Sequence, residues 1–121
     1  MAFRLERVRK NGLHFNEVFG AGARYAAGEE SLFLRECRKK GLRVYRNKAY
    51  LCIVDYSSST WFEGINEKYY FNRGGFLAAA YGRMAWLFKL YYLMQSRRIS
   101  GLGLSVVNRN IKAGMKEFQS V

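Results

Sequence analysis

The stretch on which the fold prediction depends is FGAGARYAAGEESLFL, residues 19–34. Its first half contains three glycines, Gly20, Gly22 and Gly28, among alanines. Glycine adopts backbone conformations closed to other residues and lets the chain approach another group closely. This half is therefore predicted to be a loop lying against something. It is not a dinucleotide-binding fingerprint, because the third glycine of that pattern is absent.

Two adjacent carboxylates, Glu29 and Glu30, follow the loop at the start of a helix predicted over 30–40. Apolar residues of helical periodicity mark its inner face, and a basic last turn before Gly41 marks its end. The positive end of the helix dipole alone would favour these carboxylates, by about 0.3–1 kcal/mol. A carboxylate pair behind a small-residue loop also suits a general base that takes a proton from a bound hydroxyl. Both interpretations remain open on this pattern alone.

An ordered series of short segments extends outward from this stretch and resembles the acceptor half of family 2 glycosyltransferases. The resemblance covers roughly residues 2–95 and depends on the order and spacing of the segments more than on any one motif. The segments are Phe15-Asn16-Glu17, then 19–22, 28–34, 40–45, 58–62 and 68–74.

The resemblance implies an α/β fold, a partial GT-A (Rossmann-like) arrangement of short strands and helices with a long aromatic-rich C-terminal helix. Residues 1–65 would be the acceptor-side α/β segment and residues 66–121 a C-terminal helical extension. The alternating segment Leu42–Tyr45 and the apolar run Tyr50–Val54 are the predicted strands.

The reaction implied by the resemblance is transfer of a sugar from a nucleotide-sugar to an acceptor hydroxyl, and surface polysaccharide synthesis is its expected setting. The family's catalytic carboxylate falls on Glu30, with Glu29 beside it to position the loop or the acceptor. Glu30 stands where the family usually has aspartate, so its carboxylate reaches further. The residues that the resemblance assigns to substrate binding are Gly20, Gly22, Gly28 and Trp61.

Asp55 is the only aspartate in the chain, so the Asp-x-Asp with which relatives hold Mn²⁺ or Mg²⁺ and the sugar diphosphate is absent. Many relatives have a histidine near this position, and we assign Asp55 no metal. No cofactor is expected in this chain. A nucleotide-sugar is expected to bind only if a missing N-terminal half is supplied. The chain is accordingly interpreted as a truncated or split product that is inactive alone.

The formal net charge is +12, which favours polyanionic partners such as nucleic acid or an anionic membrane surface. A small basic protein that binds nucleic acid, or one that is peripheral to a membrane, is therefore the alternative function. With His14 as the only histidine, a histidine-based zinc site or a Ser-His-Asp triad has little material. Cys37 and Cys52 are expected to be buried thiols.

A helical and very apolar segment is predicted over 66–98, followed by a short, fraying helix over 106–118. Arg83 and Lys89 interrupt the apolar run, so it is not a clean membrane span. Its aromatic and basic residues suit either an interfacial helix or a helix packed on a part of the protein outside this sequence. The N-terminus lacks the apolar stretch of a signal peptide. The expected location is the cytoplasm, with peripheral attachment at the inner face of the membrane as a variant.

Overall fold

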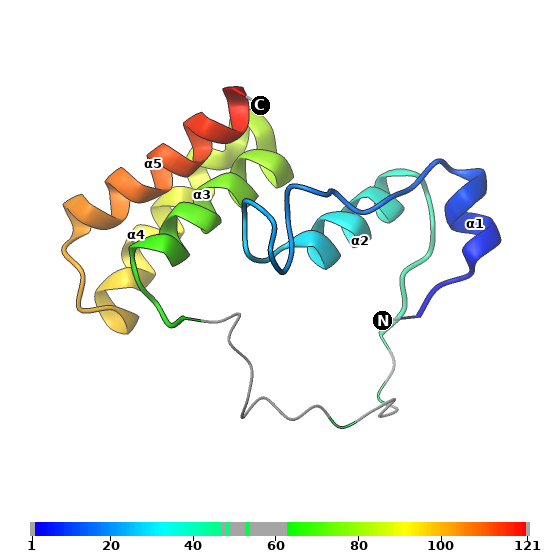
Figure 1. Ribbon diagram of the computed structural model, residues 1–121, viewed down its shortest axis with the longest axis horizontal. Helices are drawn as coiled ribbons and strands as arrows, with labels where there is room; N and C mark the ends of the chain where they lie inside the picture. Colours follow the sequence, from blue (N-terminus) through cyan, green and yellow to red (C-terminus); the bar gives the residue numbers. More distant parts are fainter. Residues whose placement is uncertain (1, 47, 49–52, 54–62, 121) are drawn as a thin grey trace.

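The protein is known from a computed structural model that describes residues 2–46, 48, 53 and 63–120. The described residues form helices in two groups, and the glycine-rich loop, which connects α1 to α2, lies between the groups (Figure 1). In chain order the elements are α1 (Leu5–Lys10), α2 (Glu29–Lys39), α3 (Glu67–Tyr81), a 3₁₀ turn η1 (Gly82–Met84), α4 (Ala85–Ile99) and α5 (Leu104–Ser120).

The larger group consists of α3, α4 and α5. Helices α3 and α5 run in the same direction and α4 returns between their ends (Figure 1). Two glycines allow the parallel pair to touch along the backbone. A Cβ atom on Gly74 would lie 2.1 Å from the carbonyl oxygen of Ile111, and one on Gly114 would lie 2.0 Å from that of Phe71. The core of the group is made of the buried residues Tyr70, Leu77, Ala85, Val107 and Ile111.

The smaller group consists of α1 and α2, which bury Val8, Phe33 and Cys37 against each other. Helix α2 confirms the helix predicted over 30–40. It ends as predicted, because Gly41 adopts φ 74° and the amide of Leu42 donates a 2.9 Å hydrogen bond to the carbonyl oxygen of Cys37. This is the glycine-dependent termination expected at a helix C-terminus.

The predicted α/β fold is wrong. In the part of the chain that the structure describes, the only β-type pairing is an isolated bridge between Phe19 and Tyr25. Residues 42–45 lack helical structure as expected, but no described segment pairs with them, and an extended segment without a neighbour is not a strand. The second predicted strand, Tyr50–Val54, lies outside the described residues apart from Ile53. The apolar side chains of the described residues are buried mainly by helices that pack on one another.

The long helix predicted over 66–98 is interrupted at η1, where Gly82 adopts φ 51°. The chain therefore turns back and makes α3 and α4 antiparallel neighbours. The expectation of a short, fraying last helix is also wrong. Helix α5 has 17 residues, and its Val107 and Ile111 are fully buried against α3. None of the described helices has the length and apolarity needed to cross a membrane.

Candidate functional site

The glycine-rich loop is closed by hydrogen bonds between its two ends. The amide of Gly20 donates to the carbonyl oxygen of Tyr25 at 2.8 Å, and the amide of Tyr25 donates to that of Val18 at 2.9 Å. Phe19 stacks on Tyr25 with ring centroids 4.8 Å apart. The loop is therefore a defined turn with an aromatic base, in keeping with the prediction that it lies against something.

The group that the loop lies against is the α3–α5 pair. The Tyr25 ring covers Gly75 of α3, where a Cβ atom would come within 2.2 Å of it. The Tyr25 hydroxyl donates a 3.3 Å hydrogen bond to the carbonyl oxygen of Gly114 in α5. Tyr25 is 1% exposed, so it anchors the loop in the groove between the two helices.

A surface ion pair reinforces this anchor. Both Arg24 Nε and Arg24 Nη2 donate to the carboxylate of Glu117 in α5, the second at 2.7 Å. This bidentate geometry is the stronger form of an arginine–carboxylate pair. The hydrogen bonds from Arg24 hold the pKa of Glu117 below its usual value, and Glu117 in turn raises the pKa of Arg24. Helix α5 therefore positions the loop that leads to the two glutamates.

The two predicted carboxylates stand in the first turn of α2, and their environments differ. The carboxyl group of Glu29 is half-buried over Gly20, 3.3 Å from where a Cβ atom on that glycine would lie. Glu30 is exposed. Gly28, immediately before them, has φ 119°, and a Cβ atom there would come within 2.7 Å of the Phe76 ring. Glycine is thus required at this position both for the backbone conformation and for the close approach of α3.

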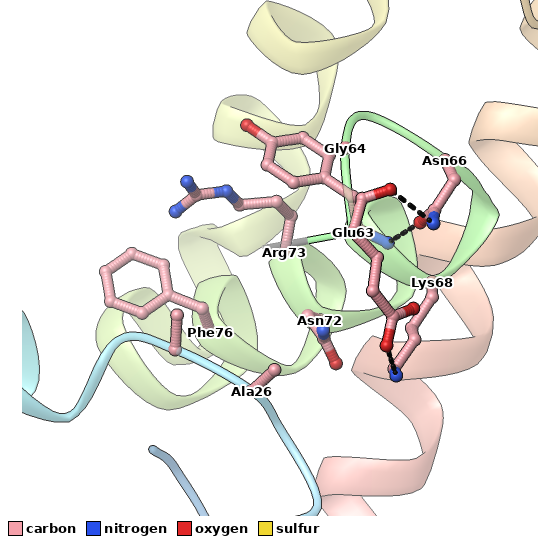
Figure 2. Close-up of a pocket in the computed structure, with 10 residues that line it drawn as sticks. Ala26, Glu63, Gly64, Asn66, Lys68, Asn72, Arg73 and Phe76 are labelled. Carbon is pink, nitrogen blue, oxygen red and sulfur yellow. Dashed lines mark hydrogen bonds and ion pairs between the residues drawn. The ribbon is translucent and has the colours of Figure 1, made fainter. Parts of the chain in front are cut away.

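Phe76 also lines a pocket of about 160 Å³, which lies between the glycine-rich loop, residues 63–66 and the first half of α3. Figure 2 shows the Phe76 ring and Ala26 at one side of it and the pair of Glu63 and Lys68 at the other. The volume is below the roughly 300–1,000 Å³ of pockets for drug-sized ligands. The pocket is therefore suited to one small group.

The pocket combines aromatic surface with hydrogen-bonding groups. Lys68 Nζ lies 2.8 Å from a carboxylate oxygen of Glu63. The guanidinium of Arg73 lies over the ring of Tyr69, 4.9 Å from its centroid, and 5.8 Å from the ring centroid of Tyr92 in α4. Burial raises the pKa of Tyr92. These contacts hold Arg73 toward α4 and leave an amide, Asn72, among the pocket-lining residues.

The structure brings together three of the predicted site residues, Gly20, Gly28 and Glu29, and places Glu30 beside them. Gly22 is at the exposed tip of the loop, with φ 79° and open space around it. The remaining predicted residue, Trp61, lies outside the described residues, as does Asp55. Cys37 is buried as expected, and its burial raises the thiol pKa.

The pocket residues of α3 were not predicted from the sequence. The signal was available, because Tyr69, Asn72, Arg73 and Phe76 follow helical spacings of three and four and must share one face. From the sequence, residues 66–98 were predicted to be one very apolar helix, and residues 68–74 form a segment of the family resemblance. Neither interpretation identified the polar face on the first half of α3 as a site.

Among the described residues, no group of three or more histidine, cysteine, aspartate or glutamate side chains is arranged to hold a metal ion. No protein-family model, curated protein or solved structure matches the chain.

Proposed function

We propose that this chain is the acceptor-binding part of a family 2 glycosyltransferase, in which Glu30 is the general base. The observation that carries the proposal is the pair of carboxylates at the start of α2, reached through a loop whose conformation requires glycine at position 28. The order of motifs from Phe15 to Gly74 supports the same assignment. The sugar would be transferred from a nucleotide-sugar to a hydroxyl group of a glycan acceptor.

The different environments of the two glutamates support different roles. Glu30 is exposed, so its carboxylate is accessible to an acceptor hydroxyl and to the proton released as that hydroxyl attacks. A base of this kind must come within hydrogen-bond distance of the proton that it accepts. Glu29 is half-buried against Gly20, where it would hold the loop in place.

The small pocket is proposed to bind a sugar ring of the acceptor, next to the ring whose hydroxyl reacts. A sugar has apolar C–H faces and a rim of hydroxyl groups. The Phe76 ring and the Asn72 amide provide surfaces for both. Because Phe76 also touches Gly28, a sugar held in this pocket would lie next to the turn that carries the two glutamates.

The donor site is proposed to come from a polypeptide outside these 121 residues, because Asp55 is the only aspartate in the sequence. Residues 42–46, which belong to no helix or strand, offer a surface for it. The side chains of Val44 and Tyr45 are 44% and 78% exposed, beside a broad groove between α1 and α2. A donor-binding polypeptide that covered this groove would bury them.

The first experiment tests acceptor binding by the chain itself. Saturation-transfer NMR with a set of oligosaccharides should show binding that Asn72→Ala or Phe76→Ala removes. Gln119→Ala, which removes an exposed amide from α5, is the matched control and should leave binding unchanged. A chain that binds no glycan in this assay, or binds equally well without Asn72 and Phe76, would contradict the assignment of the pocket.

The second experiment tests the base in an active assembly, made by co-expressing the chain with a donor-binding half. Glu30→Gln should lower turnover by about 10²–10⁴-fold and leave donor affinity unchanged. Glu6→Gln, at an exposed carboxylate of α1 that lies in none of the motif segments, should retain turnover. If Glu30→Gln instead kept turnover and changed stability by only about 0.3–1 kcal/mol, the glutamate would serve only the helix dipole.

A further inference from the structure

Helix α4 has a second apolar face that no described residue covers. Its inner side is fixed in the bundle by Ala85 and Ser96, which are fully buried. Its outer side carries large apolar side chains with much of their surface in solvent. They are Trp86 at 55%, Leu87 at 44%, Leu90 at 47%, Tyr91 at 59% and Met94 at 74% exposed. Their alternating spacings of one and three place all five on one stripe of the helix.

Basic residues stand at both ends of this stripe. Arg83 in η1 precedes it, and Arg97 and Arg98 end it in the last turn of α4; all three are exposed. By helical periodicity they lie on the same side as the apolar residues. The sequence contains no aspartate or glutamate between Lys68 and Lys116. The face is therefore an apolar strip between two positive ends, on a protein of net charge +12.

This charge pattern argues against a second copy of the chain as the occupant of the face. Two copies of α4 packed against each other in antiparallel orientation would bring Arg83 of one copy against Arg97 and Arg98 of the other. In parallel orientation, each basic end would meet its own equivalent. Like charges in an interface are unfavourable, and α4 itself has no acidic residue to compensate them.

The composition of the face matches the boundary between water and lipid. Tryptophan and tyrosine are favoured at headgroup level, while leucine and methionine reach the acyl chains and arginine pairs with anionic headgroups. The 15 residues of α4 span about 22 Å at 1.5 Å per residue, less than the roughly 30 Å hydrocarbon core. The helix could therefore lie parallel to a membrane surface, with α3 and α5 between α4 and the aqueous solvent.

We propose that the outer face of α4 docks the protein on an anionic lipid bilayer, with Trp86, Leu90 and Met94 inserted and the arginines at the headgroups. This inference does not depend on the glycosyltransferase assignment. Attraction to anionic lipid acts within about 10 Å of the surface at moderate salt and weakens as salt rises. Binding should accordingly require both the apolar strip and its basic ends.

The test is flotation of the full chain with vesicles of phosphatidylcholine alone or mixed with phosphatidylglycerol. The chain should float only with the mixed vesicles and should be released by high salt. In the Trp61→Phe variant Trp86 is the only tryptophan, so its emission should shift to shorter wavelength when mixed vesicles are added.

Two pairs of variants separate this face from the general charge of the protein. Arg97→Gln with Arg98→Gln should lower partitioning about 30-fold. Arg7→Gln with Arg9→Gln removes the same charge from exposed positions of α1 and should change it by only a few-fold. Leu90→Ser with Met94→Ser should lower partitioning at least about tenfold. Leu5→Ser, at a 51% exposed leucine of α1, should not.

Three results would overturn the proposal. In the first, the α1 and α4 arginine variants lose binding equally, which would indicate charge without a docking face. In the second, the chain ignores vesicles and binds single-stranded polyuridine, which would indicate a nucleic-acid surface. In the third, it ignores vesicles and sediments as a dimer that Leu90→Ser dissociates, which would assign the face to a second copy. Circular dichroism of each variant checks that the helices are intact.

Discussion

Gly74 of α3 and Gly114 of α5 each lie against the backbone of the other's helix. A Cβ atom on Gly74 would lie 3.0 Å from the amide nitrogen of Met115, and one on Gly114 would lie 3.0 Å from that of Gly75, with carbonyl oxygens closer still. This reciprocal contact sets the distance between the two helices. The groove that receives Tyr25 lies at the same crossing, so the crossing also sets the position of the glycine-rich loop.

The first prediction is that Gly114→Ala destabilises the protein. In an open helix this change stabilises by about 1 kcal/mol, because alanine is the better helix former. Here the new methyl group would lie 2.0 Å from the carbonyl oxygen of Phe71, and the helices would have to separate. Overpacking of this kind costs about 1–3 kcal/mol. A decrease in the free energy of unfolding would therefore indicate the close contact, and an increase would indicate an open helix. Denaturant unfolding measures it.

Gly101→Ala is the matched control, because a Cβ atom there meets nothing within 4 Å. It should leave the free energy of unfolding nearly unchanged. If Gly114→Ala were as well tolerated as Gly101→Ala, the close crossing of α3 and α5 would be incorrect.

A second prediction concerns the anchor of the loop. Tyr25→Phe keeps the ring over Gly75 and removes only the hydrogen bond to the carbonyl oxygen of Gly114. It should cost about 0.5–1.5 kcal/mol. Tyr25→Ala also removes a ring that is 1% exposed and should cost about 3–5 kcal/mol, as for other large buried aromatics. Thermal unfolding ranks the two variants.

Limited proteolysis distinguishes loss of the anchor from general destabilisation. Tyr25→Ala should make the loop around Arg24 a preferred cleavage site for trypsin while α5 remains resistant. Equal cleavage of α5, which carries Arg109 and Lys112, would mean that the whole bundle has opened.

The sequence was informative where local chemistry decides the structure. Helix α2 was predicted from its periodic apolar residues and from the glycine at its end. The loop was predicted from Gly20, Gly22 and Gly28, all of which adopt positive φ. In each case the residue type itself restricts the backbone, so no distant contact had to be known.

The lack of a sheet among the described residues and the packing of the helix bundle could not be inferred in the same way. Residues 42–45 alternate as a strand does, but a strand exists only beside a second strand, and the described residues supply none. The break between α3 and α4 at Gly82 could not be predicted from a proline, because the sequence contains none. Gly74 and Gly114 allow close packing of α3 and α5 only because each lies opposite the other's helix. They are forty residues apart in the sequence, so no local pattern reveals this contact. The candidate carboxylates were identified from the sequence. The pocket could be identified only from the structure, because its lining combines one face of α3 with residues from other segments.

A third prediction tests the turn that presents the glutamates. Gly28→Ala meets two obstacles, because φ is 119° and the methyl group would lie 2.7 Å from the Phe76 ring. Backbone strain of this type costs about 1–3 kcal/mol. The loss should be visible in denaturant unfolding, together with changed NMR shifts for the Glu29 and Glu30 amides.

Gly22→Ala provides the comparison, since Gly22 also has positive φ, 79°, but open space around it. It should show strain alone, and adding Phe76→Leu should not improve it. For Gly28→Ala, Phe76→Leu should recover part of the lost stability by making room. Identical behaviour of the two glycines in this double-mutant comparison would refute the contact between Gly28 and Phe76.

The last prediction follows from the ion pair between Arg24 and Glu117. Because Arg24 lowers the folded-state pKa of Glu117 below 4.5, the pair stabilises the folded protein fully above that value and loses its effect as pH falls through the folded-state pKa. The difference in melting temperature between wild type and Glu117→Gln should therefore be constant near neutral pH and shrink below pH 4.5. Measuring a difference cancels the titration of the other carboxylates. Glu6→Gln controls for removing one carboxylate from an exposed position elsewhere in the chain. A wild-type advantage that persisted unchanged into acid would show that Glu117 acts through packing, and that Tyr25 alone anchors the loop.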